Sequence, residues 1–263
     1  MKITLFSFLL FLPLLCVGIN PVREYTMTPD QAGMAYEAHR LTTLDAYELE
    51  AWWLHPYEDT SSVTFVLAYG DAGNMSYSLA YASSLLRRGY RVLLFDYRGF
   101  GHSTDFTHDP QALYHQEYAI DLATALLWVK ARRPKDRIAV WAFSMGTLMA
   151  TLAYEQAPFD ALIAEGLIES PLACVARIEE LKGTALVLPE GAEEAPKLLR
   201  GMSIPMLLVA GTGDEVTPLS ASMAVAEGRP ERRVLPHNGE HLRAAVSLGL
   251  PEYMEEIEDF LWF

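Results

Sequence analysis

One stretch of the sequence, residues 137–150, constrains the fold more than any other. Its first half, Arg137 to Phe143, has the apolar composition and length of a buried β-strand, and a helical pattern begins directly after Ser144. Small residues stand two positions before the serine (Ala142) and two after it (Gly146), where larger side chains would collide with neighbouring backbone. Such a serine indicates a nucleophile elbow, a strained strand-to-helix turn that exposes the hydroxyl. A serine that merely caps a helix is the alternative interpretation.

Apolar runs of strand length alternate with helical patterns along the rest of the chain. A chain of 263 residues with this alternation is typical of one α/β domain with a mostly parallel central sheet and helices on both faces. We assign this domain to residues 19–263. The predicted strands cover residues 63–69, 91–96, 137–143, 161–168, 205–210 and 232–235, after a hairpin of residues 38–43 and 47–54. The predicted helices cover residues 76–88 with Ser76 as the cap, 116–132, 145–156 and 252–263.

An acid and a base that could activate Ser144 follow later strands. Asp214 lies in a Gly-rich loop just past the strand 205–210, and His241 lies in the loop after the last strand. Loops that leave the carboxyl ends of parallel strands meet at one edge of the sheet, so one fold can bring the three side chains together. A nucleophilic serine needs a base, and that base needs a carboxylate to orient it. We therefore predict the catalytic set Ser144, Asp214 and His241.

Two other residues remain candidates for the same roles. Glu169 follows the preceding strand and could supply the acid, and His237 could be the base. We favour His241 because the intervening Asn238-Gly239 lets the loop swing toward the serine. Asp214 could also be no more than a turn-forming aspartate.

Acyl transfer also needs backbone amides that stabilise an anionic tetrahedral intermediate. The amide of Met145, directly after the serine, is one expected donor. The amide of Asp71, in the loop after the strand 63–69, is the other. Gly70 and Gly73 allow that loop to approach a substrate closely, although a plain turn would explain the same glycines.

Six motifs in register resemble the α/β-hydrolase superfamily, and the resemblance runs from about Ala38 to the C-terminus. It is closest to the small-capped serine hydrolases that include acylglycerol lipases and protein depalmitoylases. The chain departs from their pattern at Tyr69, where histidine is usual, and at Ala142, where glycine is usual. The motifs are Tyr69-Gly-Asp-Ala-Gly-Asn74, Asp96-Tyr-Arg-Gly-Phe-Gly-His-Ser103, Ala142-Phe-Ser-Met-Gly146, Ile168-Glu-Ser-Pro171, Gly211-Thr-Gly-Asp214 and Gly239-Glu-His241.

The resemblance implies a hydrolase of carboxylic esters or thioesters that forms an acyl-enzyme on Ser144. Small or lipid-like acyl esters would be its substrates, and the reaction needs no cofactor. An acyltransferase would use the same triad with another acceptor in place of water. A non-catalytic binding protein could also be built on this scaffold.

The segment 171–203 interrupts the alternation where a single crossover helix would suffice. Some thirty residues intervene, and too many of them are apolar for a solvated loop. We predict a small cap insertion here that walls an acyl pocket, with an ordinary crossover helix packed on the sheet as the alternative. A cap this short favours short-to-medium acyl esters or an exposed acyl thioester.

The N-terminal segment 1–18 has the layout of a secretory signal peptide. Lys2 precedes an uncharged apolar stretch that ends in the small residues around Cys16 and Gly18. An uncleaved membrane anchor, or lipidation at Cys16, are the alternatives, so membrane association through this segment is possible. The protein is thus expected to be exported. Cys174, the only other cysteine, is expected to be a packing residue.

Composition and missing motifs exclude other classes of function. The formal net charge of −14 argues against a nucleic-acid partner, which requires clustered lysine and arginine. No His-Glu-x-x-His, paired cysteines or phosphate-binding Gly-rich loop is present, so we expect no metal and no nucleotide cofactor.

Overall fold

The computed structural model describes residues 18–262, and its core is an eight-stranded sheet. The strand order is β10-β9-β8-β7-β4-β6-β3-β2, with parallel pairing from β10 through β6 and antiparallel pairing of β3 with both neighbours. This confirms the predicted mostly parallel α/β sheet. The strands are β2 (Tyr36–Thr42), β3 (Glu48–Leu54), β4 (Val63–Ala68), β6 (Arg91–Phe95), β7 (Arg137–Phe143), β8 (Ala161–Glu165), β9 (Met206–Gly211) and β10 (Arg232–His237).

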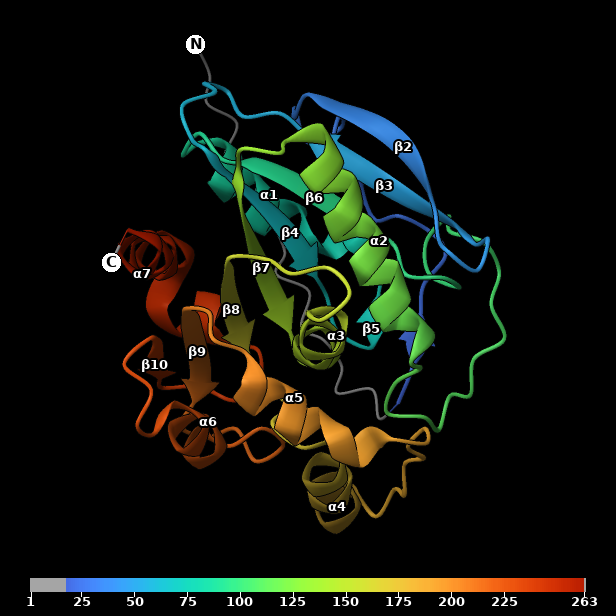
Figure 1. The fold of residues 1–263 in the computed structure, drawn as a ribbon, viewed down its shortest axis with the longest axis vertical. Helices are drawn as coiled ribbons and strands as arrows, with labels where there is room; N and C mark the ends of the chain where they lie inside the picture. Colours follow the sequence, from blue (N-terminus) through green and yellow to red (C-terminus); the bar gives the residue numbers. More distant parts are fainter. Residues whose placement is uncertain (1–17, 263) are drawn as a thin grey trace.

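Helices cover both faces of this sheet (Figure 1). The helices α2, α3 and α5 lie on one face, and α1 and α7 lie on the other. Continuous burial of the central strands explains why they lack the apolar–polar alternation of a one-sided sheet. The α-helices are α1 (Leu79–Leu86), α2 (Glu117–Arg132), α3 (Met145–Ala153), α4 (Pro171–Lys182), α5 (Ala195–Gly201), α6 (Leu219–Ala226) and α7 (Leu250–Leu261). Shorter turns are η1 (Met75–Ser78), η2 (Ala192–Glu194) and the π-turn η3 (Ala245–Gly249).

The prediction for the helix after β4 was wrong about its start. The chain first forms the 3₁₀ turn η1, and α1 begins only at Leu79. Asn74, rather than Ser76, is the capping residue, because its side chain accepts the amide of Ser76. Asparagine has a planar acceptor that reaches this amide, and Ser76 is itself occupied inside the turn.

The segment from residue 171 to 203 contains two helices instead of one. Helix α5 contacts α3 and plays the part of the crossover helix, whereas α4 is additional. Figure 1 places α4 beyond the carboxyl ends of β7 and β9. The intervening loop is tied to residues 111–113 by two backbone hydrogen bonds of Val187. Leu186 belongs to the hydrophobic core, so part of the predicted cap insertion packs into the core.

Residues 1–17, which carry most of the predicted signal sequence and Cys16, lie outside the described residues. Among residues 18–262, no helix combines the length and apolarity needed to cross a bilayer. The residues that follow this segment have a defined place. Asn20–Pro21 form strand β1, which pairs in parallel with β5 (Ala72–Gly73) in the loop after β4.

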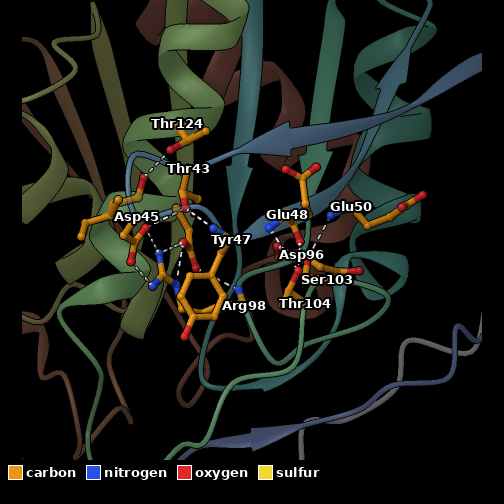
Figure 2. A network of polar contacts seen from close by, with 12 residues as sticks. Thr43, Asp45, Tyr47, Glu48, Glu50, Asp96, Arg98, Ser103, Thr104 and Thr124 are labelled. Carbon is orange, nitrogen blue, oxygen red and sulfur yellow. Dashed lines mark hydrogen bonds and ion pairs between the residues drawn. The ribbon is translucent and has the colours of Figure 1, made fainter.

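A buried arginine joins the loop after β6 to two other elements. The guanidinium of Arg98 donates to Asp121 of α2 at 2.9 and 2.7 Å and to Asp45 of the β2–β3 turn at 2.6 and 2.9 Å. Figure 2 shows Arg98 between Asp45 and the ring of Tyr47, over which it stacks at 4.2 Å. Five donors in a planar fork allow one side chain to serve both carboxylates.

Arg98→Met is expected to destabilise the protein by about 3–5 kcal/mol, because it leaves the fully buried carboxylate of Asp121 without a cation. Urea unfolding would measure this loss. In the double variant Arg98→Met/Asp121→Leu most of the stability should return, since the remaining unpaired carboxylate, Asp45, is 39% exposed and no fully buried charge is left. A double variant as unstable as the single one would contradict this account.

Candidate active site

Ser144 occupies a strained turn between β7 and α3. Its backbone angles are φ 48° and ψ −118°, a left-handed conformation that residues other than glycine rarely adopt. The turn is held from both sides. The amide of Ser144 donates to the carbonyl of Glu165 at 2.9 Å, and the Ser144 carbonyl accepts the amide and hydroxyl of Thr147 at 2.8 and 2.7 Å.

Small residues around the turn allow it to form. A Cβ on Gly146 would lie 2.0 Å from the carbonyl oxygen of Ala68, so glycine alone lets α3 approach β4 this closely. Ala142, where the resemblance predicts glycine, is buried between Ala68 of β4 and Ala164 of β8. Alanines at these paired positions leave room for its methyl group.

The three residues predicted to act together lie in one chain of hydrogen bonds. The Nε2 atom of His241 is 2.9 Å from Ser144 Oγ, and its Nδ1 atom is 2.7 Å from Asp214 Oδ2. The histidine bridges two loops that are 97 and 27 residues away along the sequence. Gly166, with φ +68°, makes room for the ring, since a Cβ there would lie 2.7 Å from His241 Cε1.

The loop of Asp214 orients its carboxylate with donors that the sequence analysis missed. Oδ1 accepts the amides of Val216 and Thr217 at 2.9 and 2.8 Å, and Oδ2 accepts the Thr217 hydroxyl at 2.6 Å. Burial favours the neutral acid, but the hydrogen bonds from His241 and Thr217 outweigh it and lower the pKa of Asp214. The spacing Asp-x-x-Thr, typical of side-chain-capped turns, was the available signal.

Glu169 and His237, the alternative acid and base, are not part of this chain of hydrogen bonds. The carboxylate of Glu169 forms a bidentate pair with Arg177 of α4 at 2.9 and 3.1 Å, and Arg177 in turn donates to the carbonyl of Val216 at 2.8 Å. The His237 side chain is buried, and neither ring nitrogen has a partner among residues 18–262. Burial lowers the pKa of His237. Neither residue touches Ser144 in the described structure, so the geometry favours Asp214 and His241.

The loop after β4 lies directly against the serine. A Cβ on Gly70 would contact the Ser144 Cβ and the Phe143 carbonyl at 3.6 Å. The predicted amide donor Asp71 is the next residue, and burial raises the pKa of its carboxyl to about 6 despite the opposing effects of its own amide and of His241. Met145, the other predicted donor, is the first residue of α3, where amides have no acceptor within the helix.

A buried glutamate beneath the site escaped the sequence analysis. Glu165 ends strand β8 and is 1% exposed. One carboxylate oxygen accepts the amide of Ala244 at 2.9 Å, three residues after His241, and the other accepts the Tyr253 hydroxyl at 3.0 Å. Because its carbonyl also accepts the Ser144 amide, Glu165 contacts both the serine turn and the histidine loop. An acid that ends an apolar strand was the sequence signal.

No cluster of three or more histidine, cysteine or acidic side chains within residues 18–262 could hold a metal ion. Cys174 is a buried free thiol, as predicted, and burial raises its pKa to about 12.

Comparison with known proteins agrees with this architecture. Residues 63–173 match the family model described as the alpha/beta hydrolase fold. An esterase of Pyrococcus furiosus, Pf2001, superposes with a TM-score of 0.74 at 23% identity, over 93% of this chain and 97% of that one. The chain is an α/β-hydrolase-fold protein. This confirms the fold that the six motifs indicated.

Two groups of curated relatives are also similar to this chain. The uncharacterized protein YfhR of Escherichia coli K12 is 26% identical over 97% of this chain and 93% of its own length. The lysophosphatidylserine lipase ABHD12 of Xenopus tropicalis is 26% identical over 56% of this chain and 39% of its own.

Glu165→Gln is expected to alter how stability depends on pH. Burial raises the pKa of Glu165, so the native state binds its proton more tightly than the unfolded chain does. The stability this provides is complete below the ordinary pKa of about 4.5 and is lost as pH rises through the folded-state pKa. The glutamine variant has no such loss, so urea titrations from pH 4 to 8 should show its stability improving relative to the natural protein. A constant difference across this range would contradict the assignment.

Proposed function

We propose that this protein is a serine hydrolase that cleaves carboxylic esters or thioesters through an acyl-enzyme. The observation that carries the proposal is the continuous chain Ser144 Oγ–His241 Nε2, His241 Nδ1–Asp214 Oδ2, with distances of 2.9 and 2.7 Å. These are hydrogen-bond distances for a nucleophile, its base and an orienting carboxylate.

In the proposed reaction Ser144 Oγ attacks the carbonyl carbon of the substrate while His241 Nε2 takes the hydroxyl proton. The bond to the leaving alcohol or thiol then breaks, and the imidazolium returns the proton to that leaving group. Water repeats the same sequence on the acyl-enzyme and releases the carboxylic acid. Asp214 holds Nδ1 and stabilises the transient imidazolium.

The developing negative charge would fall on the substrate carbonyl oxygen. The amides of Asp71 and Met145 are the proposed donors to it, because one loop packs against Ser144 and the other amide starts α3. The strained serine supports the same role, since it raises the nucleophile out of the sheet toward this position.

The names of similar proteins support an acyl ester as the substrate class. Pf2001 is an esterase and ABHD12 a lysophosphatidylserine lipase. We propose a small or lipid-like acyl ester for this chain, with no cofactor. We also propose that the protein is exported by means of residues 1–18, and N-terminal sequencing of the mature protein would test this.

Ser144→Ala is expected to abolish aryl-ester hydrolysis and fluorophosphonate labelling with the fold retained, because it removes the nucleophile. Asp214→Asn and His241→Ala should each lower kcat by about 10⁴-fold or more, since triad members act as a unit. Glu169→Gln serves as the matched control, because it changes an acid of the same rim that pairs with Arg177. Labelling that survives in Ser144→Ala, or a crippled Glu169→Gln beside an active Asp214→Asn, would refute these assignments.

We propose that the segment 171–203 lines the pocket that binds the acyl chain of the substrate. The run Leu186-Val187-Leu188 is not uniformly accessible: Leu186 is buried in the core, whereas Val187 is 51% exposed. Serine at Leu186 would therefore reduce stability. Val187 is the position at which a polar side chain leaves the core intact.

Val187→Ser is expected to raise KM for octanoate esters severalfold more than for acetate esters. Each methylene group of the acyl chain that is no longer buried against this segment lowers the binding free energy by ~0.8 kcal/mol. Leu127→Ser, at an equally exposed position on α2, is the control and should leave both constants unchanged. A chain-length series of aryl esters provides the measurement. An unchanged preference in Val187→Ser would remove this segment from the acyl pocket.

A further inference from the structure

The loop that packs against Ser144 is paired with the beginning of the described chain. The amide of Asn20 donates to the carbonyl of Asp71 at 2.8 Å, and the amide of Val22 donates to that of Gly73 at 2.9 Å. These bonds join β1 and β5 in a two-stranded parallel sheet separate from the main one. We call residues 19–26 the strap.

A buried asparagine extends this contact beyond the two strands. The Nδ2 of Asn74 donates to the strap carbonyls of Val22 and Glu24 at 3.0 and 2.8 Å, while its Oδ1 accepts the amide of Ser76 at 3.0 Å. The hydroxyl of Ser76 accepts the amide of Thr26 at 3.1 Å. The strap therefore contacts this part of the chain from residue 71 to residue 76.

The buried carboxylate of Asp96, below the loop, also connects the loop to the strap. Asp96 Oδ2 accepts the hydroxyl of Tyr25, which belongs to the strap, at 2.6 Å. Its Oδ1 accepts the Met75 amide at 2.8 Å and the Tyr69 hydroxyl at 3.2 Å, on either side of the loop. Tyr69 is the residue that departs from the histidine usual in the resembling family.

The backbone of this loop is conformationally permissive. It contains Gly70 and Gly73, and Gly73 has φ +88°. Glycine-containing backbone samples many conformations, whereas an amide aimed at a developing oxyanion must be held to within about 0.5 Å.

We propose that the strap is a positioning element of the active site, which fixes the loop 70–75 and hence the Asp71 amide against Ser144. This rests on the hydrolase function proposed above. The strap begins at Ile19, so a cut after Gly18 would leave all of its residues in the chain. Residues near the N-terminus thus contribute to catalysis without touching the substrate.

Two single substitutions test the proposal in the full chain. Tyr25→Phe removes the hydroxyl that donates to Asp96 and accepts the His102 amide, and Asn74→Asp replaces the two donors to the strap carbonyls with a carboxylate oxygen. Arg23→Ala is the matched control inside the strap, because its side chain pairs on the surface with Asp105 at 3.0 Å and not with the loop.

A misplaced oxyanion donor weakens binding of the transition state more than that of the ground state. We therefore expect kcat for an aryl acetate to fall about 10-fold or more in both variants, with KM changed less than about twofold and the control unaffected. A folded Tyr25→Phe or Asn74→Asp protein with the kcat of the control would overturn the proposal, as would a change confined to KM. If Asn74→Asp does not fold, Tyr25→Phe decides.

Hydrogen exchange of the backbone amides distinguishes a failure of the strap proposal from a failure of the proposed hydrolase function. Amides of residues 70–75 should exchange at least 10-fold faster in the two variants than in the natural protein and the control. If the natural protein hydrolyses no ester, the function fails while the exchange result still tests the strap. If the natural protein hydrolyses esters but the amides of residues 70–75 exchange no faster in the two variants, the strap proposal alone is refuted.

Discussion

The site depends on a serine held in a backbone conformation that it would not adopt alone. The φ of 48° at Ser144 is tolerated because β7 ends and α3 begins on either side of it, and both are anchored in the core. Gly146 allows the close approach of α3 to β4. The strain is thus sustained by the packing of the sheet, and the result is a hydroxyl that projects from the rim toward His241.

Around this turn buried polar groups hold the loops in addition to apolar contacts. Glu165 binds the histidine loop, Asp96 binds the loop after β4, and Arg98 holds the β2–β3 turn against α2. Each is almost fully enclosed, so each lost partner would leave a desolvated charge or carboxyl group. Loops fixed this way can keep the geometry that acyl transfer requires, while the strands beneath them provide the bulk of the stability.

The rim is also where the chain differs most from a plain sheet with crossover helices. Helix α4 adds a second layer there, and its Arg177 reaches the loop that carries Asp214. The segment 171–203 is therefore connected to the loop of Asp214 as well as to residues 111–113. Substitutions that remove the Arg177 contact are expected to affect the placement of Asp214.

The sequence by itself determined the sheet, the elbow and the three residues that meet at it. Apolar runs report burial on both faces, and Ser144, Asp214 and His241 each follow a strand whose carboxyl end must lie on the same rim. It did not reveal Glu165, Thr217, Asn74 or the strap, because each acts through partners that are distant in the chain or through backbone groups common to all residues. Nor did it identify Asn74 as the helix cap or divide residues 171–203 between core and cap. Those outcomes depend on which hydrogen bonds and contacts remain available once the sheet has formed, and only the tertiary structure decides that.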